Sequence, residues 1–204
     1  MVRRLIVAVI CVAAASCGRK DTGDSPKAGS DDSAREQAKF DAERKPEKVV
    51  EALAIGPGSR VADVGAGTGL MTVHLARAVS PNGKVVATDI APGVLELLGQ
   101  RLDKLGLGSV TEPRIVNADH PGLEAGAYDA ILLAEVDNFF TQPEAWLTEA
   151  KTALKPNGRI VIENRTYHRT QSEAAARKAG LSLVTESNPD PTHFIAVFVA
   201  GDNK

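Results

Sequence analysis

The residues best suited to chemistry surround a glycine-rich turn. The stretch VADVGAGTGLMTVHLA, residues 61–76, places Gly65, Ala66, Gly67 and Gly69 between two apolar runs. Glycine adopts the dihedral angles of tight turns and lets a ligand approach the backbone closely, so such a turn either binds a ligand or only provides geometry. Because a strand-like run precedes the turn and a helix-like run follows it, the pattern favours ligand binding.

Aspartates occupy three places in which an expected strand ends. Asp63 lies two residues before the first glycine, Asp89 ends the run VVATD and Asp119 ends RIVNAD. The carboxyl ends of parallel strands meet at one edge of a sheet, so we expect the three carboxylates to converge on one crevice. A carboxylate accepts hydrogen bonds from ribose hydroxyls or from an exocyclic amine. The alternative for any one of them is a helix cap, as for Asp89, which precedes Pro92.

The turn differs from the dinucleotide-binding pattern G-x-G-x-x-G. Its last two glycines are one residue closer together, and Asp63 lies where a pyrophosphate would repel a carboxylate. An ammonium group would instead be attracted by Asp63. The sequence therefore favours a ligand with an ammonium group over a dinucleotide.

Helix-like and strand-like patterns alternate along the chain from about residue 40. Apolar runs of strand length read RVADV, VVATD, RIVNAD, YDAILLAE and RIVIEN, and amphipathic runs of helical period separate most of them. Three connections, GPGSR, SPNGK and KPNGR, combine a proline and a tight-turn residue with a basic residue that opens the next strand. Short apolar strands separated by helices predict an α/β fold with a doubly wound, mostly parallel sheet.

The C-terminal region predicts a departure from a purely parallel sheet. The apolar runs LSLVTE and HFIAVFVA are separated only by SNPDPT. A parallel crossover requires about a dozen residues or more, so these two strands must pair antiparallel. The expected architecture is a seven-stranded, Rossmann-like sheet that is mostly parallel and has a C-terminal antiparallel strand.

The motif VADVGAGTG, together with Asp89 and Asp119, resembles the cofactor-binding motifs of class I S-adenosylmethionine-dependent methyltransferases. The likeness extends from about Phe40 to Val199 and includes the LKPNGR turn and the terminal hairpin. It implies an enzyme that transfers a methyl group from S-adenosylmethionine to a small-molecule acceptor, within a domain that spans residues 40–204.

The resemblance also implies roles for individual residues. The glycine loop would line the methionine and ribose portions of the cofactor, and Asp63 would lie near the methionine ammonium group. Asp89 would hold the ribose hydroxyls, and Asp119 would face the adenine amine. Glu135, just past the fourth expected strand, would lie close to the methionine portion. The expected cofactor contacts are Asp63, Gly65, Ala66, Gly67, Gly69, Asp89, Ile90, Asp119 and Glu135.

The substrate side of the expected site carries few signals. A sulfonium is already an activated leaving group, so positioning supplies most of the rate, and a catalytic residue need not exist. The Asn/Asp-Pro-Pro-aromatic motif of amino-methylating nucleic-acid methyltransferases is absent from AEVDNFF, which follows the fourth strand. Tyr167 and His168 either border the pocket or belong to a solvated loop. We expect Phe139, Phe140 and Trp146 to pack in the core or under a lid.

Composition excludes several classes of partner. The chain has 24 basic and 26 acidic residues, a net charge of −2 and only 4% aromatic residues, so we expect no nucleic-acid partner. The only cysteines, Cys11 and Cys17, lie near the N-terminus, and the histidines have no second ligand at metal spacing. We therefore expect no metal site.

The first residues predict an export signal. Arg3 and Arg4 precede LIVAVICVAAA, which has the length of a signal-peptide core and falls short of the ~20 residues of a membrane-spanning helix. The small residues before Cys17 resemble the lipobox of bacterial lipoproteins, which implies a signal over residues 1–17 and a lipid anchor at Cys17. The alternatives are an ordinary cleaved signal or an extension from a misplaced start. Residues 18–39 offer little to bury and predict a disordered tether.

The expected anchor conflicts with the expected cofactor. A lipoprotein would lie outside the cytoplasm, where S-adenosylmethionine is not made, whereas an unused signal would leave the domain in the cytoplasm. The conflict leaves a second function open: a membrane-tethered nucleoside-binding module that keeps the methyltransferase fold without turnover. The sequence determines neither the methyl acceptor nor the oligomeric state.

Overall fold

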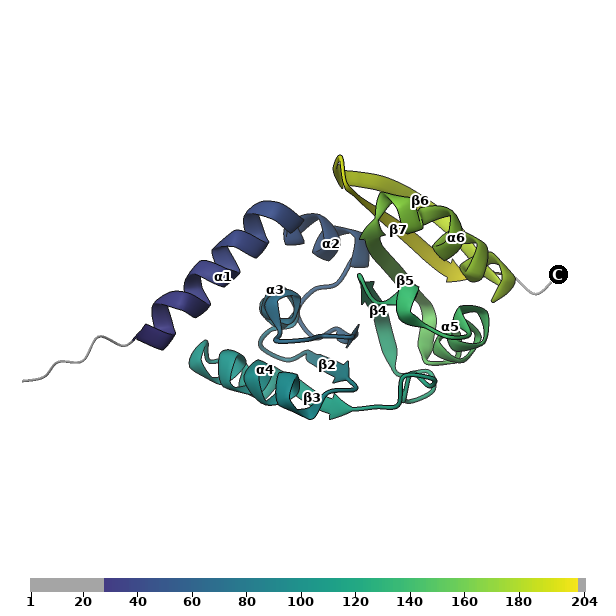
Figure 1. Ribbon diagram of the computed structural model, residues 1–204. Helices are drawn as coiled ribbons and strands as arrows, with labels where there is room; N and C mark the ends of the chain where they lie inside the picture. Colours follow the sequence, from purple (N-terminus) through teal and green to yellow (C-terminus); the bar gives the residue numbers. More distant parts are fainter. Residues whose placement is uncertain (1–27, 202–204) are drawn as a thin grey trace, which may run out of the picture.

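The computed structural model describes residues 28–201, so the predictions for the signal and the lipid anchor at Cys17 lie outside the described residues. Seven strands form one sheet in the order β3-β2-β1-β4-β5-β7-β6 (Figure 1). The strands are β1 Arg60–Val64, β2 Lys84–Asp89, β3 Thr111–Ile115, β4 Tyr128–Ala134, β5 Leu154–Arg165, β6 Leu181–Asp190 and β7 His193–Ala200.

Strand direction follows the prediction. The pairs β3–β2, β2–β1, β1–β4 and β4–β5 are parallel, whereas β7 is antiparallel to both of its neighbours, β5 and β6. Only β7 therefore runs against the rest of the sheet, as the short connection between the last two strands requires. The predicted α/β, doubly wound, mostly parallel architecture is confirmed.

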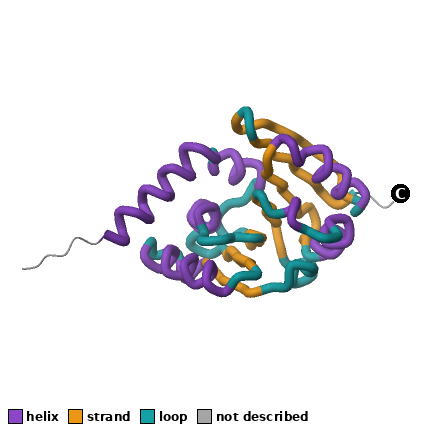
Figure 2. The backbone as a smooth tube through the Cα atoms, in the orientation of Figure 1, coloured by secondary structure: helices purple, strands orange, loops and turns teal. Residues whose placement is uncertain are grey.

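Helices cover both faces of the sheet (Figures 1 and 2). Successive residues of a buried strand point to opposite faces, so Ile131 and Leu133 pack in one core with α5 and α6, while Ala130 and Leu132 pack in the other with α2, α3 and α4. Burial on both faces explains why the central strands are continuously apolar. The helices are α1 Ala28–Arg44, α2 Pro46–Leu53, α3 Leu70–Val79, α4 Pro92–Lys104, α5 Pro143–Thr152 and α6 Arg169–Lys178, with short 3-10 turns η1 Gly108–Val110, η2 Asp137–Phe139 and η3 Thr166–His168.

The prediction of a disordered tether is wrong for residues 28–39, which belong to α1. Figure 2 shows this helix running along the side of the molecule that carries α3 and α4. Polar contacts fix it there: the Gln37 amide donates to the Leu70 carbonyl at 3.1 Å, and Arg101 of α4 pairs with Glu36. Near the end of α1, Phe40 also packs against the core that α3 and α4 cover. Ala, Glu, Gln, Lys and Arg are strong helix formers, so a segment with little to bury can form a helix when such contacts hold it.

The expectation that Asp119 ends a strand is also wrong. Strand β3 ends at Ile115. The next residue, Val116, still donates its N–H to the Asp89 carbonyl at the end of β2. The Asn117 side chain then accepts a hydrogen bond from the Asp119 N–H at 3.0 Å, which turns the chain away from the sheet. None of the helices within residues 28–201 has both the length and the apolar character to cross a membrane.

Candidate cofactor site

A cavity of about 260 Å³ lies at the carboxyl ends of β1, β2 and β4, where ligands bind in open parallel sheets. The volume lies just below the range of about 300–1,000 Å³ typical of small-molecule sites. A larger hollow of about 850 Å³ lies between α5 and α6, but it is an open groove away from the strand ends. The cavity is lined by Val64, Gly65, Thr88, Asp89, Ile90, Val116, Asn117, Ala118, His120, Glu135, Val136, Phe139, Phe140 and Trp146.

The three glycines of the loop all have left-handed backbone angles, with φ values of 68°, 54° and 86° for Gly65, Gly67 and Gly69. A Cβ on Gly65 would lie 2.6 Å from Val136 Cγ2, and one on Gly69 would lie 2.8 Å from Leu98 Cγ. These two glycines are therefore required for packing. Nothing lies within 4 Å of a Cβ on Gly67, so the middle of the loop faces open space that a ligand can use.

Asp89 is half-buried, lines the cavity and shapes the loop. One carboxylate oxygen accepts a hydrogen bond from the Gly67 N–H, and the other accepts one from the Ala91 N–H, both at 3.0 Å. The second bond forms a local turn two residues long, and α4 begins at Pro92 with Ala91 as its N-cap and no side-chain cap, so the helix-cap alternative for Asp89 is wrong. The neighbouring Ile90 also lines the cavity, and its side chain is 61% exposed.

Thr88 provides an unsatisfied polar group in the wall of the cavity. This residue is fully buried, and its hydroxyl oxygen has no hydrogen-bond partner within the described part of the chain. An unpaired buried hydroxyl costs about 1–3 kcal/mol, so such a group in a cavity wall indicates a ligand with a polar atom.

Asp63 lies behind the loop and not among the residues that line the cavity. It is 1% exposed and accepts a hydrogen bond from the Thr72 hydroxyl at 2.6 Å. Burial raises its pKa to about 6 against the opposing effect of that hydrogen bond, and the charge of Asp89 adds to the rise. Its contact with an ammonium group stays a prediction.

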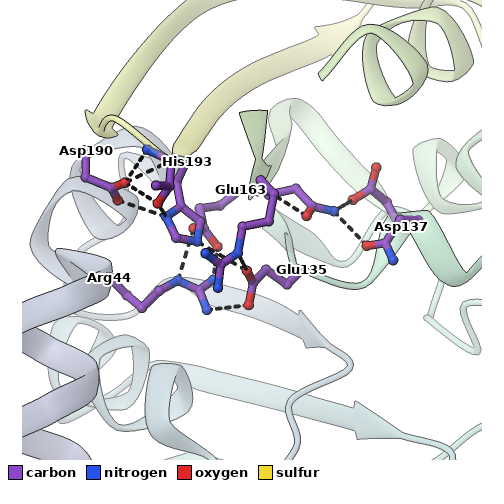
Figure 3. Close-up of polar contacts among 10 residues, drawn as sticks. Arg44, Glu135, Asp137, Glu163, Asp190 and His193 are labelled. Atoms are coloured by element: carbon purple, nitrogen blue, oxygen red, sulfur yellow. Dashed lines mark hydrogen bonds and ion pairs between the residues drawn. The ribbon is translucent and has the colours of Figure 1, made fainter. Parts of the chain in front are cut away.

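Glu135 lines the cavity with a non-glycine backbone in the left-handed region, at φ 50°. Its carboxylate is surrounded by the basic side chains of Arg44, Arg165 and His193 (Figure 3). Burial disfavours the charged form, but the basic neighbours together outweigh it and lower the pKa of Glu135. Glu135 is therefore held as a carboxylate beside the cavity.

Sequence reasoning missed the cluster of charged residues around Glu135. Arg44, at the end of α1, pairs with Glu135 and also with the fully buried Glu163, which lies within the apolar run RIVIEN. Burial raises the pKa of Glu163 despite the opposing charge of Arg44. A charged residue inside a buried strand was the available signal, because such a residue requires a partner of opposite charge.

A second polar network fixes the turn after β4. The Asn164 amide donates to Asp137 at 2.7 Å and to Asn138 at 2.8 Å, and the Ser172 hydroxyl also donates to Asp137. Residues of β5 and α6 thereby hold η2, which carries Phe139 at the cavity rim. The expectation of core packing is wrong for Phe139, whose side chain is 76% exposed.

The other expected aromatic residues have different positions. Phe140 stacks on the buried Trp146 with ring centroids 4.2 Å apart, and both line the cavity. Tyr167 is 78% exposed, lies against the His168 ring and does not line the cavity. The structure therefore gives no support for a pocket contact by Tyr167.

The structure brings some of the predicted cofactor residues together and leaves others aside. Gly65, Asp89, Ile90 and Glu135 line one cavity, whereas Asp119 lies in the exposed loop beside it, between two lining residues. Ala66, Gly67 and Gly69 complete the loop without lining the cavity. Among residues 28–201 no group of acidic, His or Cys side chains has the arrangement of a metal site.

Comparisons with known proteins give a consistent result. A family model described as "Methyltransferase domain" matches residues 62–160. The ubiquinone biosynthesis O-methyltransferase of Xanthomonas axonopodis pv. citri is 29% identical, over 70% of this chain and 57% of that protein. The ubiquinone/menaquinone biosynthesis C-methyltransferase of Burkholderia cenocepacia is 32% identical, over 53% of this chain and 44% of that protein. The chain thus spans about half the length of these curated relatives.

Solved structures share the fold. A SAM-dependent methyltransferase from Aquifex aeolicus matches with a TM-score of 0.72 and 22% identity, covering 81% of this chain and 97% of that one. Geranyl diphosphate C-methyltransferase from Streptomyces coelicolor, solved with S-adenosyl-L-homocysteine, matches with a TM-score of 0.67 and 14% identity, covering 76% of each chain. The chain therefore has the fold of S-adenosylmethionine-dependent methyltransferases, and residues 62–160 match the methyltransferase domain model.

Proposed function

We propose that this protein transfers a methyl group from S-adenosylmethionine to a small apolar acceptor. The observation that carries the proposal is the cavity in which Gly65, Thr88 and Glu135, from three strand ends, meet around an unpaired buried hydroxyl. When bound, the cofactor supplies a sulfonium methyl group that is already activated for transfer. The protein's own contribution is then to bind, to orient and to exclude water.

The residues around the cavity suit these tasks. Asp89 offers two carboxylate oxygens at the end of β2 to the hydroxyls of a ribose, and Glu135 offers a fixed carboxylate to the methionine portion. The stacked rings of Phe140 and Trp146 form an apolar wall that excludes water. Because water screens charges, its exclusion strengthens each electrostatic contact within the site.

The character of the rim supports an apolar and planar acceptor. The exposed Phe139 and Ile90 border the cavity, so an acceptor approaching from solvent meets apolar side chains first. An aromatic ring stacks favourably on another aromatic ring. Two relatives named for ubiquinone biosynthesis support the same class, and we propose a phenol or hydroquinone as the acceptor.

A methyl-transfer assay tests this function. The full chain is incubated with S-adenosylmethionine carrying a labelled methyl group and with catechol, hydroquinone or duplex DNA as acceptors. We expect label in a phenol, with release of S-adenosylhomocysteine, and none in DNA. Transfer to DNA alone would contradict the proposal. Tight cofactor binding without transfer to any tested phenol would favour the nucleoside-binding module over the enzyme.

A further inference from the structure

The carboxylate of Glu135 is held by three basic side chains from three different elements (Figure 3). Arg44 of α1 donates to one oxygen at 2.5 Å. Arg165, at the end of β5, donates to the other oxygen at 2.6 Å, and the His193 ring of β7 lies 3.2 Å from that oxygen. Both oxygens are thus fixed, although the side chain remains 30% exposed.

Arg44 is itself held firmly. Its Nε and Nη2 atoms both donate to the carboxylate of Glu163, while Nη1 is the atom that donates to Glu135. Glu163 is fully buried, so its charge has no solvent to stabilise it and requires the guanidinium. The Arg44 guanidinium also lies over the Phe40 ring, 5.6 Å from the centroid. Its planar fork therefore connects a buried carboxylate to a carboxylate of the cavity.

The backbone of Glu135 supports the same conclusion. A non-glycine residue at φ 50° is unusual and persists where surrounding contacts maintain it. The Glu135 N–H donates to the Glu163 carbonyl at 2.8 Å, so main chain and side chain are both fastened to the end of β5. An unusual backbone conformation in a residue that lines a cavity indicates a functional constraint.

We propose that Arg44 is a positioning residue for cofactor binding, which acts by holding the Glu135 carboxylate in place against the methionine portion. This inference rests on the proposed function. A carboxylate that is already oriented loses little freedom when the ligand binds, so the affinity is higher than for a mobile side chain. Helix α1, whose residues 28–39 fall within the predicted tether, then contributes its last residue to the cofactor site.

The purely structural alternative is that Arg44 only attaches α1 and compensates the charge of Glu163. The two interpretations differ in whether the effect of Arg44 depends on Glu135. Arg44→Lys retains the charge but loses the fork that reaches both carboxylates. Arg44→Lys, Glu135→Gln and the double variant of the full chain are titrated with S-adenosylhomocysteine, and their thermal unfolding is measured alongside. Coupling between the two positions then appears as non-additive changes in affinity.

We expect Arg44→Lys to weaken S-adenosylhomocysteine binding by about tenfold and Glu135→Gln by at least as much, within the usual range of coupling between contacting charged residues. In the Glu135→Gln background, Arg44→Lys should change the affinity by less than about twofold. The matched control is Arg60→Lys, since Arg60 pairs with Glu124 at the opposite end of the sheet. This control should lower the melting temperature without changing the affinity.

Two results would overturn the inference. One is a lowered melting temperature for Arg44→Lys with unchanged affinity, and the other is an equal loss of affinity in the presence and absence of the Glu135 carboxylate. Failure of the proposed function looks different, because the unaltered protein itself would then show no measurable binding of S-adenosylhomocysteine. A variant that does not fold is recognised by its unfolding curve, and Arg44→Gln in a Glu163→Gln background, which removes the buried charge together with its partner, then replaces Arg44→Lys in the cycle.

Discussion

The carboxylate of Asp89 accepts a hydrogen bond from the Gly67 N–H at 3.0 Å and so connects the end of β2 to the middle of the glycine loop. Its other oxygen accepts from the Ala91 N–H directly before α4. The same side chain lines the cavity. Asp89 therefore fixes the glycine loop and the turn before α4 while it lines the cavity, and its contact with a ribose stays a prediction.

Replacing Asp89 by alanine should weaken S-adenosylhomocysteine binding at least tenfold. Each hydrogen bond from a ribose hydroxyl to the carboxylate contributes roughly 1.5–3 kcal/mol, and ~1.4 kcal/mol is a factor of ten in affinity. Stability should fall by about 1–2 kcal/mol because two backbone N–H groups lose their acceptor. Titration calorimetry and thermal unfolding measure the two effects separately.

The matched control for this change is Asp129→Ala. Asp129 accepts a backbone hydrogen bond from the Arg60 N–H at 2.8 Å, at the start of β1 and far from the cavity. Its loss should lower the melting temperature and leave the affinity unchanged. An unchanged affinity for Asp89→Ala would remove Asp89 from the cofactor site.

Two glycine-to-alanine changes should separate backbone strain from ligand contact. Gly67 has φ 54° and Gly126 has φ 63°, and a Cβ at either position meets nothing within 4 Å. Both changes should therefore destabilise the fold by about 1–2 kcal/mol, the cost of a left-handed L-residue. Only Gly67→Ala should also weaken S-adenosylhomocysteine binding, because only that Cβ enters the space above the loop. Equal affinities for both variants in a calorimetric titration would contradict this role of Gly67.

The raised pKa of Asp63 gives a pH-dependent contribution to stability. Its folded-state pKa of about 6 lies above the ordinary value near 4, so the contribution is fully present below about pH 4 and is lost as the pH rises through about 6. Asp63→Asn keeps an acceptor for the Thr72 hydroxyl and removes the buried charge. Relative to the unaltered protein, this variant should gain up to about 3 kcal/mol between about pH 4 and pH 7.

Urea unfolding across this pH range measures the difference, and Asp129→Asn is the control of opposite sign. Burial disfavours ionisation of Asp129, but Lys155 and the Arg60 N–H outweigh it and lower its pKa. That stabilising contribution is present above the ordinary value and lost at lower pH, so Asp129→Asn should cost more at neutral pH than in acid. A difference between Asp63→Asn and the unaltered protein that does not vary with pH would contradict the burial of an ionising Asp63.

Cell fractionation tests the predicted lipid anchor at Cys17. We expect the full chain to sediment with membranes and Cys17→Ser to be released, because one thiol carries the lipid. The matched control is Cys11→Ser, which alters the apolar core of the signal and should keep the protein in the membrane fraction. An unaltered chain that stays in the cytoplasm would contradict the anchor.

Most of the fold could be predicted because burial leaves a direct pattern in the sequence. Continuous apolar runs such as RVADV belong to strands that are buried on both faces, and their spacing identifies the helices between them. The edge strand β3 was harder, since Thr111 alone among its residues is buried and Ile115 is 61% exposed. Its end at Ile115 depends on the Asn117 turn rather than on hydrophobicity.

The ionic cluster around Glu135 could not be predicted because no periodic pattern connects its members. Arg44 and Glu163 are 119 positions apart, and only the docking of α1 brings them together. The polar composition of residues 28–39, the larger part of α1, predicted disorder, because a charged segment has the same composition whether or not it docks on a folded domain. The meeting of Asp89 with the glycine loop could be anticipated, in contrast, because the two follow the carboxyl ends of the neighbouring parallel strands β2 and β1.

Calorimetric titration of the full chain with S-adenosylhomocysteine and, separately, with NAD tests the central claim most directly. Both ligands contain adenosine, but only NAD carries a pyrophosphate, which the carboxylates of Asp89 and Glu135 in the cavity wall would repel. We expect S-adenosylhomocysteine to bind at one site per chain and NAD to give no measurable heat under the same conditions. Binding of NAD alone would contradict a methyltransferase site in this cavity.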